Sequence, residues 1–282
     1  MSLGLCRLEG LRLARSRRPQ VAAGALALFL VLMLAGFYTY ARSRTGGEAE
    51  FRYTFENRSY FNGLTFALYA FYFGFVLLLP VFVATEGGAQ LAGDAGAGTL
   101  GLLLARPLSK ARLFFVKLGV AAGFTVLLVG LFLAAALAVG LFAVGWGELR
   151  LYPGVLQMTD RPQALAQGEA LGRFALAWPA ASLALFAPLA FSFWISSLAK
   201  SAVNAVGTAV ALYLTLYVIA EVHFFADLRP WLFTSHAAYW RALFQERIDW
   251  HELGRHAAAL AGFACLFTAL AFRRFRRREE GA

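Results

Sequence analysis

Six long apolar runs limit what this chain can fold into more than any other feature of its sequence. A helix that crosses about 30 Å of hydrocarbon needs roughly 20 apolar residues. Charged residues make up only 15% of the 282-residue chain, which is too few to cover a water-exposed surface. The sequence therefore predicts an all-α polytopic membrane protein, a single domain over 1–282 with six transmembrane helices. The six runs lie at 21–41, 62–85, 118–145, 180–198, 202–220 and 257–272.

Positive charges concentrate in alternate segments between these runs. The chain carries 26 Lys and Arg against 16 Asp and Glu, a balance that would suggest nucleic-acid binding in a soluble protein. The N-terminal segment, the second-to-third connection, Lys200 and the tail at 273–282 hold 15 of the basic residues and five of the acidic ones. Basic residues favour the cytoplasmic side of a membrane. We therefore expect a multi-pass protein of the plasma (inner) membrane with both termini cytoplasmic, in contact with membrane lipids and not with nucleic acid.

The connection at 86–117 holds the most informative local pattern. Its glycines, from Gly87 to Gly98, are expected to loosen the chain before Thr99 caps a short amphipathic helix that Pro107 ends. Ser109 offers a second cap, for the helix that enters the third run. Two interpretations stay open: a connection that rests on lipid headgroups, or a docking surface for a cytoplasmic partner. The apolar residues that share one face of the short helix are Leu100, Leu103 and Leu104.

This connection resembles the signature of the type-2 ABC transporter permease family. The resemblance rests on Asp94, on Gly98-Thr99-Leu100 with the leucines that follow, on Arg106-Pro107-Leu108-Ser109, and on Lys117. The N-terminal stretch, with Glu9 ahead of several arginines, is similar to the elbow helix of these permeases, expected here at 1–19. Segments similar to the NosY-like subgroup are Gly172 to Phe174, the run from Ser196, and the run from Leu228.

The resemblance implies that 86–117 is a cytoplasmic coupling loop, whose short helix sits in a cleft of an ATP-binding subunit. The sequence has no GxxxxGK[ST] phosphate loop, so a separate ABC ATPase subunit is expected to carry ATP and Mg. We expect no cofactor and no enzymatic activity in this chain. The predicted ATPase-coupling residues are Asp94, Thr99, Leu100, Leu103, Leu104, Arg106, Pro107 and Ser109.

The connections on the opposite side are rich in aromatic residues. The segment 42–61 predicts an interfacial stretch, and 163–178 an interfacial helix on the outer surface. Resemblance to the family implies that 226–253 dips back as short half-helices that help to close an outer gate. A belt of aromatic residues at the membrane surface is the alternative for its tryptophans.

Candidate binding sites within the membrane are few. Tyr69 and Phe73 share a face of the second run, and the fifth run carries Asn204, Tyr213 and Tyr217. These five residues are candidates for a substrate path, with packing against lipid as the alternative. All four histidines lie near the outer side, but no two are spaced four apart on one helical face, so we expect no metal site. GxSxG and HExxH motifs are absent from the sequence.

The function that these patterns favour is the permease subunit of an ABC transporter. It would be an exporter, paired with itself or with a paralogous permease, that works by alternating access. The alternative is a membrane anchor or assembly subunit that recruits cytoplasmic proteins without transporting a substrate. A neighbouring gene for a P-loop ATPase would favour transport.

Overall fold

The computed structural model describes residues 2–43, 62–98, 109–152, 156, 158–159 and 161–277. Within these residues, six helical segments are long and apolar enough to cross a membrane. The prediction of an all-α polytopic membrane protein is confirmed. The six segments are Arg17–Thr39, Gly63–Gly96, Lys110–Ala143, Gln167–Leu198, Ala202–Glu221 and Trp250–Arg277.

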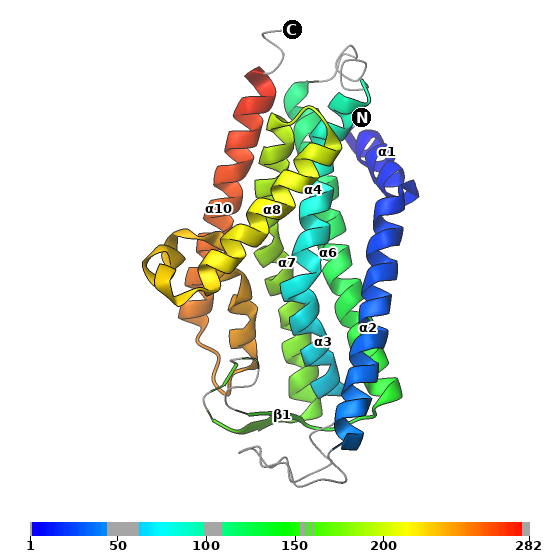
Figure 1. Cartoon of the computed structure of the whole chain (residues 1–282), viewed down its shortest axis with the longest axis vertical. Coiled ribbons are helices and arrows are strands. Elements are labelled where there is room, and N and C mark those ends of the chain that lie inside the picture. The colour runs from blue at the N-terminus through cyan, green and yellow to red at the C-terminus, as the bar shows by residue number, and fades with distance from the viewer. Residues whose placement is uncertain are drawn as a thin grey trace.

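One helix, α7 (Gln167–Leu198), lies at the centre of the bundle (Figure 1). It packs against α4 (Leu79–Gly96), α6 (Lys110–Ala143), α8 (Ala202–Glu221) and α10 (Trp250–Arg277). Many of its buried residues are alanine and serine, and small side chains let neighbouring helices approach closely within a membrane.

The first spanning helix, α2 (Arg17–Ser43), lies at the edge of the bundle (Figure 1). It contacts α3 (Gly63–Leu77) and α6 on one face, and most of its remaining surface is exposed. The short α1 (Ser2–Arg15) precedes it and packs against the start of α6. The helix α1 ends at Arg15, and the chain turns at Ser16 before α2 begins. The elbow helix expected at 1–19 stays a prediction.

The two ends of the bundle differ in charge. At one end lie α1, the end of α4, the start of α6 and the end of α10 (Figure 1). We call it the basic end, because α1, the α1–α2 turn and the last turns of α10 bring their arginines there. The predicted basic tail at 273–282 is helical through Arg277, where α10 ends.

A small β-hairpin closes the opposite end of the bundle (Figure 1). Its strands β1 (Leu149–Leu151) and β2 (Gln163–Leu165) are antiparallel. Asn62 joins it to α3: its Oδ1 accepts hydrogen bonds from the backbone N–H groups of Leu64 and Thr65, and its Nδ2 donates to the carbonyl of Glu148. The outer surface helix predicted at 163–178 is wrong, since this segment forms β2 and then the first turns of the spanning helix α7.

Three short helices fill the connection between α8 and α10: η2 (His223–Trp231), α9 (Phe233–His236) and η3 (Ala237–Phe244). Phe233, Trp240 and Phe244 bury their rings against the spanning helices. The α9–η3 part of the connection is therefore packed into the bundle beside α7, α8 and α10, whereas η2 buries none of its residues.

The glycine-rich stretch after Glu86 is helical, contrary to expectation. The second span breaks once, at Leu78, before Pro80, whose missing N–H removes a helical hydrogen bond. It then continues as α4 to Gly96. A Cβ on Gly87 would collide with the Oγ of Ser192 and lie 2.8 Å from the carbonyl oxygen of Leu189. Gly87 therefore serves close packing of α4 on α7, and Gly88 lies in the same way against Val206 of α8.

Replacing Gly87 with leucine is expected to destabilise the bundle by about 1–3 kcal/mol, because the new side chain forces α4 away from α7. The midpoint of thermal unfolding in detergent measures this loss. Gly24→Leu is the matched control, since a Cβ at Gly24 meets no atom within 4 Å. Equal midpoints for the two variants would contradict the packing role of Gly87.

Candidate functional site

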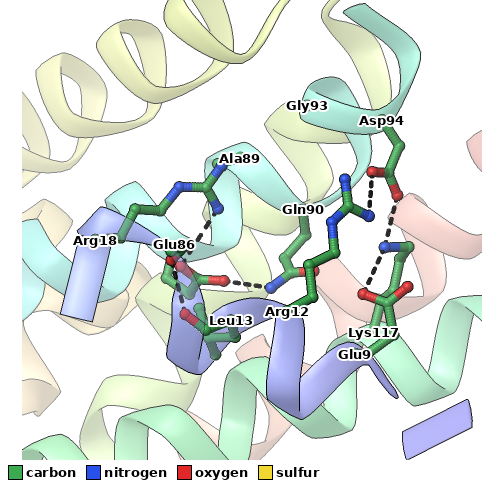
Figure 2. A pocket seen from close by; sticks show the side chains of 11 residues that line it. Glu9, Arg12, Leu13, Arg18, Glu86, Ala89, Gln90, Gly93, Asp94 and Lys117 are labelled. Atoms are coloured by element: carbon green, nitrogen blue, oxygen red, sulfur yellow. Dashed lines mark hydrogen bonds and ion pairs between the residues drawn. The ribbon is translucent and has the colours of Figure 1, made fainter. Parts of the chain in front are cut away.

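Six charged side chains and the amide of Gln90 meet in a cleft of about 130 Å³ at the basic end (Figure 2). They come from four helices, and we call them the charge cluster. Three are cations and three are carboxylates, so the formal charge of the cluster is zero. Its members are Glu9 and Arg12 of α1, Arg18 of α2, Glu86, Gln90 and Asp94 of α4, and Lys117 of α6.

Asp94 is the centre of the more buried half of the cluster. Its Oδ2 lies 2.6 Å from the Nζ of Lys117, and its Oδ1 lies 2.7 Å from the Nη1 of Arg12 (Figure 2). The Nζ of Lys117 also lies 3.1 Å from the Oε2 of Glu9. The side chains of Lys117 and Asp94 are only 1% and 3% exposed. Each therefore depends on the other for its charge to be tolerated inside the protein.

Glu86 is the centre of the second half. Its Oε2 lies 3.5 Å from the Nη1 of Arg18, and its Oε1 accepts a hydrogen bond from the side chain of Gln90 (Figure 2). The Glu86 side chain is buried, whereas Arg18 is 41% exposed and covers it from the solvent side. Glu86, Gln90 and Asp94 are spaced four residues apart, so they form one polar stripe along α4.

The charge cluster holds together the helices on both sides of the segment 99–108. The second and third spans are each 34 residues long, or about 51 Å, against about 30 Å of hydrocarbon. Each is therefore about 20 Å longer than the hydrocarbon core requires. Asp94 and Lys117 join α4 and α6 to α1 at the basic end.

The predicted coupling residues are placed only in part. Asp94 is buried in the charge cluster, close to the start of the segment 99–108, and does not lie on an exposed surface. Ser109 is exposed and precedes α6 at the capping position, but its side chain makes no capping hydrogen bond. Four of the eight predicted residues, three leucines and one arginine on the short helix, lie outside the residues that the structure describes. The predicted residues outside the described part of the chain are Thr99, Leu100, Leu103, Leu104, Arg106 and Pro107.

The five predicted substrate-path residues do not form one site. Tyr69 and Phe73 lie on the outward face of α3, with ring centroids 6.5 Å apart. Tyr213 is buried and stacks on Tyr217 and against Phe233 of the short-helix connection.

Asn204 is exposed near the other end of α8, nine residues or about 14 Å from Tyr213. None of the five lines the polar cleft or the apolar grooves between α2 and α6 and between α6 and α10.

At the opposite end, Arg173 of α7 holds the end of η3. Its guanidinium donates to the carbonyls of Leu243 and Gln245, at 2.5 and 2.6 Å, and lies 2.7 Å from the Oε1 of Glu169. Nearby in η3, the hydroxyl of Tyr239 donates to the carbonyl of Ala180, and burial raises the pKa of Tyr239 to about 12. The connection is therefore fixed to α7 by polar contacts as well as by its aromatic rings.

Replacing Arg173 with methionine is expected to cost about 1.5–3 kcal/mol, because it removes hydrogen bonds from a charged donor. Amide hydrogen exchange in 237–245 should become at least about tenfold faster. Arg255→Met is the control, since the Arg255 side chain is 70% exposed and its contact with Glu252 is 3.8 Å long. Unchanged exchange in Arg173→Met would refute this anchoring role.

Two histidines that are distant in the sequence meet where the connection joins α10. The Nδ1 atoms of His236 and His256 lie 2.7 Å apart, and the Nε2 of His256 lies 3.7 Å from the Oε1 of Glu252. Helical spacing could not reveal this pair, because its members lie on different helices. Within the described residues, no group of three or more His, Cys, Asp or Glu side chains is arranged to hold a metal ion.

Sequence reasoning missed Arg12, Arg18, Glu86 and Gln90 as members of the charge cluster. Glu86 is expected at the start of a loose, glycine-rich loop after the second span, and this expectation hides the helical spacing of Glu86, Gln90 and Asp94. That four-residue spacing is the signal that identifies Glu86 and Gln90, whereas Arg12 and Arg18 reach the cluster only through the fold.

The fold and the cluster agree with a match to a known family. A family model described as ABC-2 family transporter protein matches residues 13–227, from the end of α1 into η2. The match is to the family as a whole and does not single out the NosY-like subgroup. No curated protein matches the chain. The family match covers well over half of the 282 residues, and the chain therefore belongs to the ABC-2 family of transporter proteins.

Proposed function

We propose that this chain is the permease subunit of an ABC exporter, driven by a separate cytoplasmic ATPase subunit. Family membership supports a role in ABC transport. The observation that carries the finer proposal is the charge cluster, in which buried Asp94 and Lys117 join α4, α6 and α1 at the base of the segment 99–108. Such a junction is suited to pass a movement of that segment into the spanning helices.

In this proposal, the short helix predicted at 100–106 docks on the ATPase subunit. Closure of that subunit around ATP and Mg moves the helix, and the charge cluster transmits the displacement to α4 and α6 together. Packed helices respond to such a displacement as rigid bodies that rock between two states. The chain itself holds no ATP in this scheme and carries out no chemistry.

Orientation and assembly complete the proposal. The basic end faces the cytoplasm, because arginine and lysine accumulate on that side of a membrane. The exposed faces of α3 and α8, with Tyr69, Phe73, Asn204 and Tyr217, face a second permease chain, identical or paralogous, across a substrate path. The connection at 223–249 acts as the outer gate and is held to α7 by Arg173. Membership of the NosY-like subgroup, which rests on Gly172 to Phe174 and the runs from Ser196 and Leu228, stays a prediction.

The test is ATP hydrolysis by the complex that this chain, tagged and expressed in its own cells, forms with an ABC ATPase, purified and placed in lipid nanodiscs. Lipids, drugs, peptides and metal ions are added in turn. We expect the two proteins to co-purify and one substrate class to raise the rate of hydrolysis. A chain that purifies without any ATPase contradicts the proposal. If no added substrate class changes the rate of ATP hydrolysis by the complex, the result supports a non-transporting anchor instead.

A further inference from the structure

A long apolar groove runs between α2 and α6 on the outside of the bundle. Its volume is about 860 Å³. The α2 wall includes Ala23, Leu26 and Leu30, and the α6 wall includes Gly123 and Leu127. Residues of α1 close the groove at the basic end, among them Leu13, which also lines the polar cleft of the charge cluster. One end of the groove therefore touches the helix that carries Glu9 and Arg12.

The length and the apolar lining of the groove suit an extended hydrocarbon chain. On α6 its wall runs from Val120 to Val139, which is about 28 Å along the helix and close to the full thickness of the hydrocarbon core. Half of this length, about one leaflet, is enough for an acyl chain that lies parallel to α2 and α6. The side chains that line the groove are apolar.

Positive charge is available at the end of the groove that α1 closes. Ala14 and Pro19 line this end, and Arg15 and Arg17 lie between them in the sequence, at the turn from α1 to α2. Both arginines are exposed, and neither forms an ion pair with any of the described residues. Arg12 and Arg18, in contrast, are paired with Asp94 and Glu86. Arg15 and Arg17 are thus free to bind an anion beside the apolar groove.

We propose that this groove is a binding site for an anionic phospholipid of the leaflet at the basic end. One acyl chain lies between α2 and α6 in the half of the groove next to α1, and the headgroup phosphate pairs with Arg15 and Arg17. A lipid bound in this way holds α1 against α2 and α6, which keeps Glu9 and Arg12 in place for Lys117 and Asp94. The inference does not depend on which substrate is transported.

Photo-crosslinking of the full-length chain in nanodiscs tests the site. The probes are phosphatidylglycerol and phosphatidylcholine that carry a diazirine on one acyl chain, and peptide mass spectrometry locates the crosslinks. We expect phosphatidylglycerol to label peptides of both walls, within 23–31 and 120–131. Substituting glutamine for Arg15 and Arg17 should weaken this labelling about fivefold for each arginine and leave phosphatidylcholine labelling unchanged.

Two glycines of α6 give a matched pair of variants. A Cβ on Gly123 or on Gly119 meets no atom within 4 Å, so leucine fits the fold at both positions, but only Gly123 lines the groove. Gly123→Leu should abolish the labelling of both walls, and Gly119→Leu should preserve it.

Equal labelling by the two lipids, insensitive to Arg15 and Arg17, overturns the proposal and identifies ordinary boundary lipid. Labelling that disappears when the chain dimerises also overturns it, because the groove is then a contact between copies.

Discussion

Replacing Lys117 with methionine is expected to destabilise the chain by about 3–5 kcal/mol, because it leaves the buried carboxylate of Asp94 without its closest partner. Methionine is similar in length and fills the same space, so the loss measures the charge and not the packing. Arg12 still contacts Asp94, but its side chain is 54% exposed. The midpoint of thermal unfolding in detergent and the yield of folded protein both report this loss.

Two further variants separate the ion pair from general effects of losing a lysine. Lys200→Met is the control, because Lys200 is exposed at the same end of the bundle, and it should leave the midpoint unchanged. Adding Asp94→Asn to Lys117→Met should restore most of the stability, since the uncompensated charge is then removed. If the double variant is no more stable than Lys117→Met, the two side chains are not coupled as the structure indicates.

Replacing both Leu103 and Leu104 with glutamate is expected to release the ATPase subunit. The two leucines share one face of the helix predicted at 100–106, and two charges on an apolar docking face must be desolvated on binding. We expect co-purified ATPase to fall by at least about tenfold, while the chain still inserts in the membrane with an unchanged unfolding midpoint. Quantitative mass spectrometry of the tagged complex gives the ratio.

The matched control for this pair is Leu102→Glu. Leu102 falls on the opposite face of the same predicted helix, so it should retain the ATPase. If all three glutamates act alike, the segment does not dock as a helix with one apolar face. Full retention of the ATPase subunit by the double variant would contradict the docking proposal.

The spanning helices could be predicted from the sequence because hydropathy follows directly from the bilayer. Their ends could not, since α4, α6, α7 and α10 extend past the apolar runs. Charged Glu169 and Arg173 lie outside the apolar run at 180–198, so the sequence predicts a surface helix for their segment. Both belong to the first turns of α7, where Arg173 donates to carbonyls of η3. Such partners come from segments about 70 residues away and leave no local pattern.

In the candidate site too, sequence patterns identify some residues, but the contacts between distant residues arise only from the fold. Asp94 and Lys117 were identified from their resemblance to a family signature, and their direct contact is a result of the fold. Gly87 was interpreted as a flexible residue, because the sequence does not show that Ser192 packs on it. The meeting of His236 with His256 likewise depends on how η2, α9 and η3 fold back against α10.

The central claim is that ATP bound to a separate subunit moves the membrane helices of this chain. It is tested most directly by the distance between spin labels at two exposed positions, Phe142 at the end of α6 and Phe224 in η2. Both are replaced with cysteine after the two exposed native residues, Cys6 and Cys265, are changed to serine. Labelled chain is diluted with unlabelled chain, so that each complex carries one labelled pair.

Double electron–electron resonance is recorded on the ATPase complex without nucleotide and after trapping with MgATP and vanadate. The account predicts two different distance distributions, and a single unchanged distribution when Leu103 and Leu104 are both glutamate. Identical distributions in the intact complex, while the ATPase subunit hydrolyses ATP, would contradict it.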